Sequence, residues 1–132
     1  MLTAKQLAEY SDIGFLVLTD FVDEASCKAL RERANQLVGD FDERDVKSIF
    51  STREQSRLTD DYFLGSSEKI RFFFEEDAFL PDCSLKRKKE QSINKIGHAL
   101  HELDPIFRTF STSADIQQLV SDLGLNSGQR HG

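Results

Sequence analysis

The segment "DYFLGSSEKIRFFFEE", residues 61–76, constrains the fold more than any other part of the chain. Its two ends are aromatic and flank the turn-forming residues 65–67, so the segment predicts two short strands joined by a turn. Alternation along the second strand gives two faces, with Ile70, Phe72 and Phe74 on one and Arg71, Phe73 and Glu75 on the other. Aromatic stripes of this kind are typical of a core rather than of a cofactor site.

The N-terminal residues predict a short helix followed by a strand. Thr3 and Gln6 stand in capping-box register at the start of a helix that extends to about Ser11. Gly14 interrupts the helical spacing. The continuous apolar run at residues 15–18, "FLVL", is typical of a buried strand.

Two longer helices are predicted with identifiable ends. Asp23 is a suitable N-cap for a helix that Gly39 ends. Its apolar face repeats every three or four residues: Cys27, Leu30, Ala34, Leu37 and Val38. The last helix begins near Ser113 and ends at Gly124, with Leu125 placed for a Schellman contact. Its apolar face consists of Ile116, Leu119, Val120 and Leu123.

A further amphipathic pattern predicts a helix that Ser92 caps and that Asp104 and Pro105 end. Its apolar face consists of Ile93, Ile96, Leu100 and Leu103. On such a helix, Lys95 and His98 lie about 60° apart on the polar side. Two interpretations remain open: both side chains are solvated, or the Lys95 ammonium points into a pocket and pairs with a carboxylate or phosphate.

His98, His101 and Asp104 are side chains of the types that bind zinc or iron. At about 100° and 1.5 Å per residue, the two histidines of a helix lie about 60° apart and can converge on one ion. Asp104 lies about 120° around the helix and about 9 Å along its axis from His98. One helix therefore supplies two ligands and not three, so the pattern does not predict a metal site.

Length and charge limit the classes of function. The 132 residues correspond to one domain, and a net charge of −6 argues against general binding to nucleic acid or to anionic membranes. The basic run "KRKK" at residues 86–89 falls in a predicted flexible linker, residues 80–90, and is interpreted as solvated. The charged segment 40–60 is predicted to be a loop.

The two cysteines, Cys27 and Cys83, are too few for a secreted disulfide framework. The N-terminal sequence "MLTAKQLAEY" has neither the apolar core of a signal peptide nor an arginine-rich transit pattern. The longest apolar run, "GFLVL", is far too short to span a bilayer. A reducing, cytoplasmic location is the default expectation.

Three stretches together resemble the phytanoyl-CoA dioxygenase family: "IGFLVLTDFVDEASCKAL", the aromatic segment 61–76, and "SINKIGHALHELDPIF". They follow in the same order and at matching separations, and the resemblance covers about residues 1–125. It implies an α+β fold of helices with a few short strands. This would be the N-terminal part of the double-stranded β-helix, a cupin-like jelly roll, of Fe(II)- and 2-oxoglutarate-dependent oxygenases.

The resemblance also implies which residues are functional. The family's iron site is a facial triad of a His-x-Asp pair and a distant second histidine, but neither His-x-Asp nor His-x-Glu occurs in this sequence. No metal ligand and no catalytic residue is therefore assigned. One residue is assigned to the co-substrate: the lysine of "INK", Lys95, which in the family's pattern contacts 2-oxoglutarate.

Residues 126–132, "NSGQRHG", depart from the family, which continues there with apolar strand sequence. We therefore expect a truncated or short form of the dioxygenase that is inactive as this chain and binds neither Fe(II) nor 2-oxoglutarate tightly. The alternative is a non-catalytic helical module that binds a protein partner through uncovered apolar faces.

Overall fold

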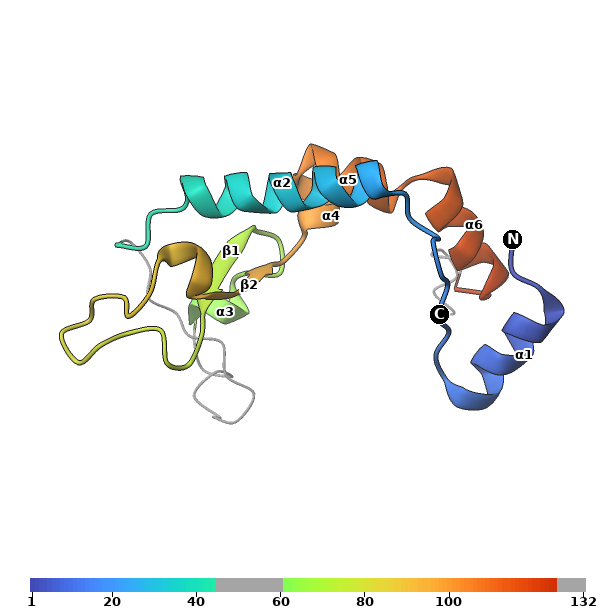
Figure 1. The fold of residues 1–132 in the computed structure, drawn as a ribbon, viewed down its shortest axis with the longest axis horizontal. Coiled ribbons are helices and arrows are strands. Elements are labelled where there is room, and N and C mark those ends of the chain that lie inside the picture. Colours follow the sequence, from blue (N-terminus) through green and yellow to red (C-terminus); the bar gives the residue numbers. More distant parts are fainter. Residues whose placement is uncertain (45–60, 126–132) are drawn as a thin grey trace.

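The structure is a computed structural model that describes residues 1–44 and 61–125 (Figure 1). In chain order the elements are α1 (Ala4–Ile13), α2 (Glu24–Asp40), α3 (Asp61–Leu64), β1 (Arg71–Phe74), the 3₁₀ helix η2 (Lys89–Gln91), β2 (Ile93–Gly97), α4 (Leu100–Leu103), α5 (Pro105–Ser111) and α6 (Ala114–Asp122). The long helix α2 contacts α5 and runs between two ends of the molecule. One end carries the β1–β2 hairpin with α3, and the other carries α1 and α6.

The predicted capping box at the start of α1 is confirmed. The Thr3 hydroxyl accepts a hydrogen bond from the Gln6 backbone N–H at 3.2 Å, and the Gln6 side-chain oxygen accepts one from the Thr3 N–H at 2.8 Å. The helix ends at Gly14, whose φ of 81° is left-handed and whose N–H donates to the Tyr10 carbonyl. The stop is therefore as predicted, although the last turn extends to Ile13.

The strand predicted at residues 15–18 is wrong. These residues have no regular secondary structure, and the side chains of Phe15 and Val17 are 59% and 76% exposed. A strand requires a neighbour for its backbone N–H and C=O groups, and within residues 1–44 and 61–125 no strand pairs with this segment.

The N-cap of α2 is confirmed, because the Asp23 carboxylate accepts a hydrogen bond from the Ser26 N–H at 2.8 Å. Gly39 does not stop the helix, which continues to Asp40. Val38 is buried, as expected for the apolar face, but Cys27 is exposed. The predicted face is wrong at Cys27; the principal contacts of α2 are with the short elements α5 and η2.

The end of α6 forms the predicted Schellman motif. Gly124 is left-handed, with a φ of 68°, and its N–H donates to the Ser121 carbonyl at 3.0 Å. The Leu125 N–H donates to the Val120 carbonyl at 2.9 Å. The last two predicted features of the chain, the start at Ser113 and the stop at Gly124, are both confirmed.

The two-stranded sheet is where the secondary-structure prediction fails most. β1 pairs antiparallel with β2, with Phe72 opposite Ile96 and Phe73 opposite Lys95. The predicted first strand is instead the single helical turn α3, and residues 93–97, predicted to be helical, form β2. β1 needs a hydrogen-bonding partner, and residues 93–97 supply it, so tertiary pairing overrides the helical spacing.

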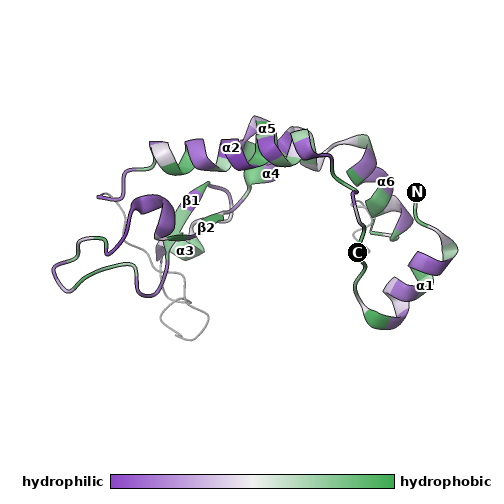
Figure 2. Ribbon diagram, viewed as in Figure 1, coloured by the Kyte–Doolittle hydropathy of each residue, from purple (hydrophilic) through white to green (hydrophobic). Residues whose placement is uncertain are grey.

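The aromatic core predicted from residues 70–75 is confirmed. Phe73 and Phe74 are fully buried. On one face of the hairpin, the Phe72 ring stacks on Phe41 with ring centroids 4.3 Å apart. On the other face, the Phe73 ring meets Tyr62 and Phe63 of α3 edge to face, at 5.4 and 5.6 Å. Figure 2 shows hydrophobic residues over β1, β2 and α3, whereas hydrophilic and hydrophobic residues alternate along α2.

The basic run at residues 86–89 is not entirely solvated. The Lys89 side chain is 16% exposed, and its ammonium donates hydrogen bonds to the backbone carbonyls of Gly39 and Phe41. These carbonyls lie at the C-terminal end of α2, where backbone acceptors lack helical partners and the helix dipole favours a cation. Lys89 therefore joins the long helix to the hairpin end of the molecule, which the sequence analysis did not predict.

Candidate functional site

Lys95 lies in the middle of β2 and is half-buried. It stands directly opposite Phe73 on β1, and directly paired residues project from the same face of a sheet. That face is the one covered by Tyr62 and Phe63 of α3. Lys95 is therefore presented from a strand, beside an aromatic cluster, and not from the polar side of a helix as the sequence analysis predicted.

The aliphatic stem of Lys95 lies along Gly97. A β-carbon added to Gly97 would lie 3.1 Å from Cε of Lys95 and within 4 Å of its Cγ and Cδ. A side chain at this position would press on the stem and shift its flexible end. Packing of the stem in this way fixes the direction of the lysine side chain relative to the strand.

His98 directly follows β2 and contacts the same aromatic cluster. Its ring centroid lies 5.7 Å from that of Phe63 and 6.2 Å from that of Phe73. Its backbone N–H donates to the Lys69 carbonyl at 2.8 Å, which extends the pairing of the hairpin by one step. The structure therefore brings Lys95 and His98 to the same side of the hairpin, although by a different route from the helix that was predicted.

Ser66 is the residue of this site that the sequence analysis treated only as a turn former. It is fully buried, and its hydroxyl oxygen lies 2.7 Å from Nδ1 of His98 and 2.6 Å from the Phe63 carbonyl oxygen. A buried hydroxyl with two partners holds the turn after α3 against the residue after β2. A serine in a glycine-containing turn has no sequence signal that distinguishes this role.

His101 and Asp104 lie apart from this site. His101 is on the exposed side of α4, 3.9 Å from the carboxylate of Glu102. Asp104 is buried, accepts a 2.6 Å hydrogen bond from Nε of Arg33, and caps α5 by accepting from two backbone N–H groups at 3.1 and 3.2 Å. Asp104 does end the preceding helical turn, as predicted, but Pro105 opens α5 instead of ending a helix.

The charge of Asp104 is well stabilised. Burial raises the pKa of this carboxyl, but the hydrogen bond from Arg33 and those from the first turn of α5 outweigh it, so the pKa lies below its usual value. His98, His101 and Asp104 thus have separate neighbours. In the part of the chain that the structure describes, no three His, Cys, Asp or Glu side chains are grouped so that they could hold a metal ion.

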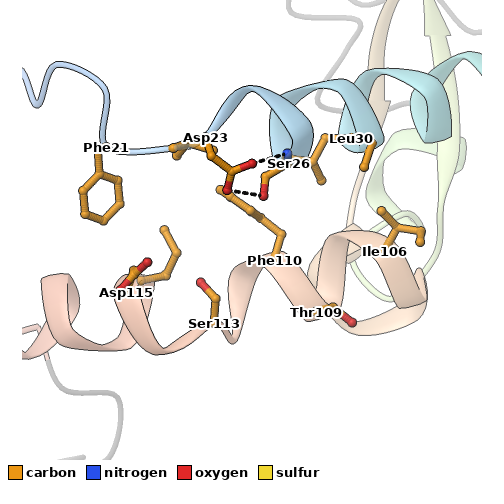
Figure 3. Close-up of a pocket in the computed structure, with 12 residues that line it drawn as sticks. Phe21, Asp23, Ser26, Leu30, Ile106, Thr109, Phe110, Ser113 and Asp115 are labelled. Atoms are coloured by element: carbon orange, nitrogen blue, oxygen red, sulfur yellow. Dashed lines mark hydrogen bonds between the residues drawn. The ribbon is translucent and has the colours of Figure 1, made fainter.

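A separate feature is a groove of about 420 Å³ between the start of α2 and helices α5 and α6 (Figure 3). Its walls are mostly apolar, and its lining includes Phe21, Leu30, Ile106, Phe110 and Ile116. The carboxylates of Asp23 and Asp115 also line it. Lys95 is not part of this lining, and two carboxylates disfavour an anion, so the groove is not a second site for a dicarboxylate.

Among the described residues, the feature suited to a small anion is Lys95, whose stem packs along Gly97 beside the aromatic cluster of Tyr62, Phe63 and Phe73. None of the helices in residues 1–44 and 61–125 has both the length and the hydropathy that crossing a membrane requires. Both cysteines are exposed.

The chain is similar in sequence to known proteins of one family. The family model described as "Phytanoyl-CoA dioxygenase (PhyH)" matches residues 10–131. The chain is 49% identical over 123 residues to "Phytanoyl-CoA dioxygenase" of Arabidopsis thaliana, which covers 93% of this chain and 43% of the relative. It is 43% identical over 129 residues to "Phytanoyl-CoA dioxygenase domain-containing protein 1" of Bos taurus, covering 94% and 44%. The chain thus spans less than half the length of these curated relatives.

Proposed function

Because the chain belongs to the phytanoyl-CoA dioxygenase family, we propose that residues 1–125 form the N-terminal part of an Fe(II)- and 2-oxoglutarate-dependent dioxygenase. In the complete domain, the hairpin and its helices would lie against the double-stranded β-helix. We propose that Lys95 binds a carboxylate of 2-oxoglutarate, and that the reaction is hydroxylation of a small organic substrate.

The observation that carries this proposal is the position of Lys95 on β2. Its stem is packed along Gly97, and it projects from the hairpin face that Phe73 and α3 make apolar. An ammonium next to an apolar wall interacts more strongly with a carboxylate than one in bulk water does, because the local dielectric constant is lower. Lysine suits a dicarboxylate as a point charge with three donors.

The described residues do not fit iron, and we assign none of them to it. In enzymes of this class, iron and 2-oxoglutarate together supply oxidative decarboxylation of the co-substrate coupled to hydroxylation. Lys95 contributes binding and orientation of the co-substrate only. Since the sequence has no His-x-Asp or His-x-Glu pair, we expect no turnover from these 132 residues alone.

The test is a titration of the 132-residue chain with 2-oxoglutarate, monitored by ¹H–¹⁵N chemical shifts. Desolvation of the charged groups and the loss of side-chain and ligand freedom offset most of the attraction between one ammonium and a carboxylate. We therefore expect a Kd on the order of millimolar. Residues of β2 should shift, and Lys95→Met should abolish the effect. Lys88→Met, which removes an equal charge at an exposed position, is the matched control and should not. Equal binding by both variants would reject the proposal.

A reducing, cytoplasmic location is proposed with this function. What supports it is the cysteine content, since two cysteines, Cys27 and Cys83, are too few for the disulfide framework of a small secreted domain. Labelling of both thiols by iodoacetamide in freshly lysed cells checks it, and a disulfide-linked form would contradict it.

A second candidate is a non-catalytic module that binds a protein partner. What favours it is the exposure of Phe15 and Val17 in an irregular segment, since two such apolar side chains are costly to leave in water. Turnover of 2-oxoglutarate by the purified chain would exclude this candidate as the sole function. No turnover, together with a stable complex that Val17→Ser disrupts, would favour it over the enzyme.

A further inference from the structure

We infer that Ser66 is a positioning residue that fixes His98 in the tautomer protonated at Nδ1, which leaves Nε2 as the hydrogen-bond and proton acceptor of the ring. The tautomer follows from the geometry alone. Its use toward a ligand rests on the proposed binding of 2-oxoglutarate at Lys95.

The first step is a count of protons around Ser66. Its hydroxyl has one proton and lies 2.6 Å from the carbonyl oxygen of Phe63, an atom that can only accept. The hydroxyl proton therefore occupies that contact. The second contact, 2.7 Å to Nδ1 of His98, must then receive its proton from the histidine.

The alternative arrangement is unfavourable. If the hydroxyl donated to Nδ1 instead, two oxygen atoms would face each other at 2.6 Å with no proton between them. Ser66 is fully buried, so no bulk water is available to relieve that repulsion. The cost of leaving a buried hydrogen bond unmade is enough to favour one tautomer by roughly 5- to 150-fold.

The ring is also held in place. The edge-to-face contact with Phe63 at 5.7 Å and the tilted contact with Phe73 at 6.2 Å restrict rotation about the side-chain bonds of His98. Because Nδ1 donates its proton to Ser66, Nε2 carries no proton in the neutral ring. In the same way, the hydrogen bond made by one ring nitrogen sets the role of the other in histidines that bind metals or transfer protons.

As a consequence, one side of the hairpin carries a hydrogen-bond donor, Lys95, and a hydrogen-bond acceptor, His98. The Lys95 ammonium is a donor, and Nε2 of the Nδ1-protonated His98 tautomer is an acceptor. A carboxylate has no proton to offer Nε2, so His98 is not a second contact for 2-oxoglutarate. It is suited to a hydroxyl or amide N–H of a molecule bound beside the co-substrate, which makes it a specificity-determining residue of the proposed site.

The experiment reads the tautomer directly and needs no ligand. Long-range ¹H–¹⁵N correlation spectra of the uniformly ¹⁵N-labelled chain are recorded at alkaline pH, where imidazoles are neutral. The His98 signals are assigned by their loss in His98→Asn, a variant whose amide N–H can still donate to Ser66. We expect Nδ1 of His98 to give the shift of a protonated nitrogen and Nε2 that of a bare one.

Ser66→Ala supplies the causal test. It should redistribute His98 toward the Nε2-protonated form and leave the exposed His101 unchanged. A wild-type His98 protonated at Nε2, or a Ser66→Ala spectrum identical to wild type, would overturn the inference. If Ser66→Ala does not fold, the wild-type spectrum still decides the tautomer. Failure of the separate 2-oxoglutarate titration would reject the proposed ligand without affecting the tautomer.

Discussion

Removing the Asp104 side chain should destabilise the chain more than removing any exposed carboxylate. The side chain is 1% exposed, accepts a 2.6 Å charged hydrogen bond from Arg33 of α2, and caps α5. It therefore joins two segments that are 71 residues apart in sequence. Asp104→Ala tests whether this contact fixes the long helix to the part of the chain that follows β2.

The expected magnitude has two parts. Loss of an N-cap costs about 1 kcal/mol. Breaking a fully buried ion pair costs roughly 3–5 kcal/mol, but Arg33 remains 29% exposed and its charge is partly hydrated, so we expect about 1–2 kcal/mol from this part. The total for Asp104→Ala is about 2–3 kcal/mol. Asp104→Asn keeps a capping oxygen and should cost about half as much.

The assay is urea unfolding followed by circular dichroism for Asp104→Ala, Arg33→Met and the double variant. The sum of the losses of unfolding free energy in the two single variants should exceed the loss in the double variant, because the two side chains interact directly. Glu32→Gln is the control: its partner Lys28 is 3.8 Å away on the same helix, but both side chains are more than half exposed, so the loss should stay below about 0.5 kcal/mol. A loss below about 0.5 kcal/mol for Asp104→Ala, or strict additivity of the two single losses, would show that the Arg33–Asp104 contact does not hold α2 to the segment after β2.

Stability should also depend on pH through Asp104. The folded chain holds the pKa of this carboxyl below its ordinary value of 3.8, so unfolding requires proton uptake in acid. The contribution is fully present at neutral pH and is lost as the pH falls below about 4 and through the folded pKa. In Asp104→Asn this part of the acid destabilisation should be absent.

Three further predictions concern the hairpin and the metal. Gly97→Ala should leave stability nearly unchanged, because the displaced atom is the flexible end of Lys95, yet weaken 2-oxoglutarate binding in the shift titration; unchanged binding would mean that the stem position is irrelevant. Hydrogen exchange should protect the amides of residues 71–74 and leave those of residues 15–18 unprotected, and the reverse order would contradict the pairing of β1 with β2. Anaerobic calorimetry should detect no one-to-one Fe(II) site tighter than micromolar, and such a site would show that a ligand set exists after all.

Local signals predicted some helix ends correctly, although Gly39 does not end α2. The N-caps Thr3 and Asp23 were predicted from their side chains, and the stop at Gly124 from its lack of one. Each contacts residues within about one helical turn. The aromatic core was also predictable, since fully buried Phe73 and Phe74 belong to a run that no solvent-facing element accommodates. These features depend on short stretches of sequence.

The sites were less predictable because they depend on contacts between distant segments. Ile93 and Ile96 have helical spacing, but they pair with a strand about twenty residues earlier. Ser66 and His98 are 32 residues apart, and neither has a sequence signal that points to the other. The role of Lys95 toward 2-oxoglutarate was predicted from family resemblance. The structure places Lys95 on a strand and not on a helix, and its role remains a proposal.

The most direct test of the proposed role of Lys95 is kinetic and uses a chimera of residues 1–125 joined to the remainder of the Arabidopsis thaliana relative. The quantity measured is the KM for 2-oxoglutarate in Fe(II)-dependent decarboxylation. If Lys95 pairs with a carboxylate of the co-substrate, Lys95→Ala removes an interaction worth about 2 kcal/mol and should raise this KM about 30-fold, whereas the exposed His101→Ala should leave it unchanged. Equal and small effects of the two substitutions would contradict the account and place Lys95 on a solvated surface.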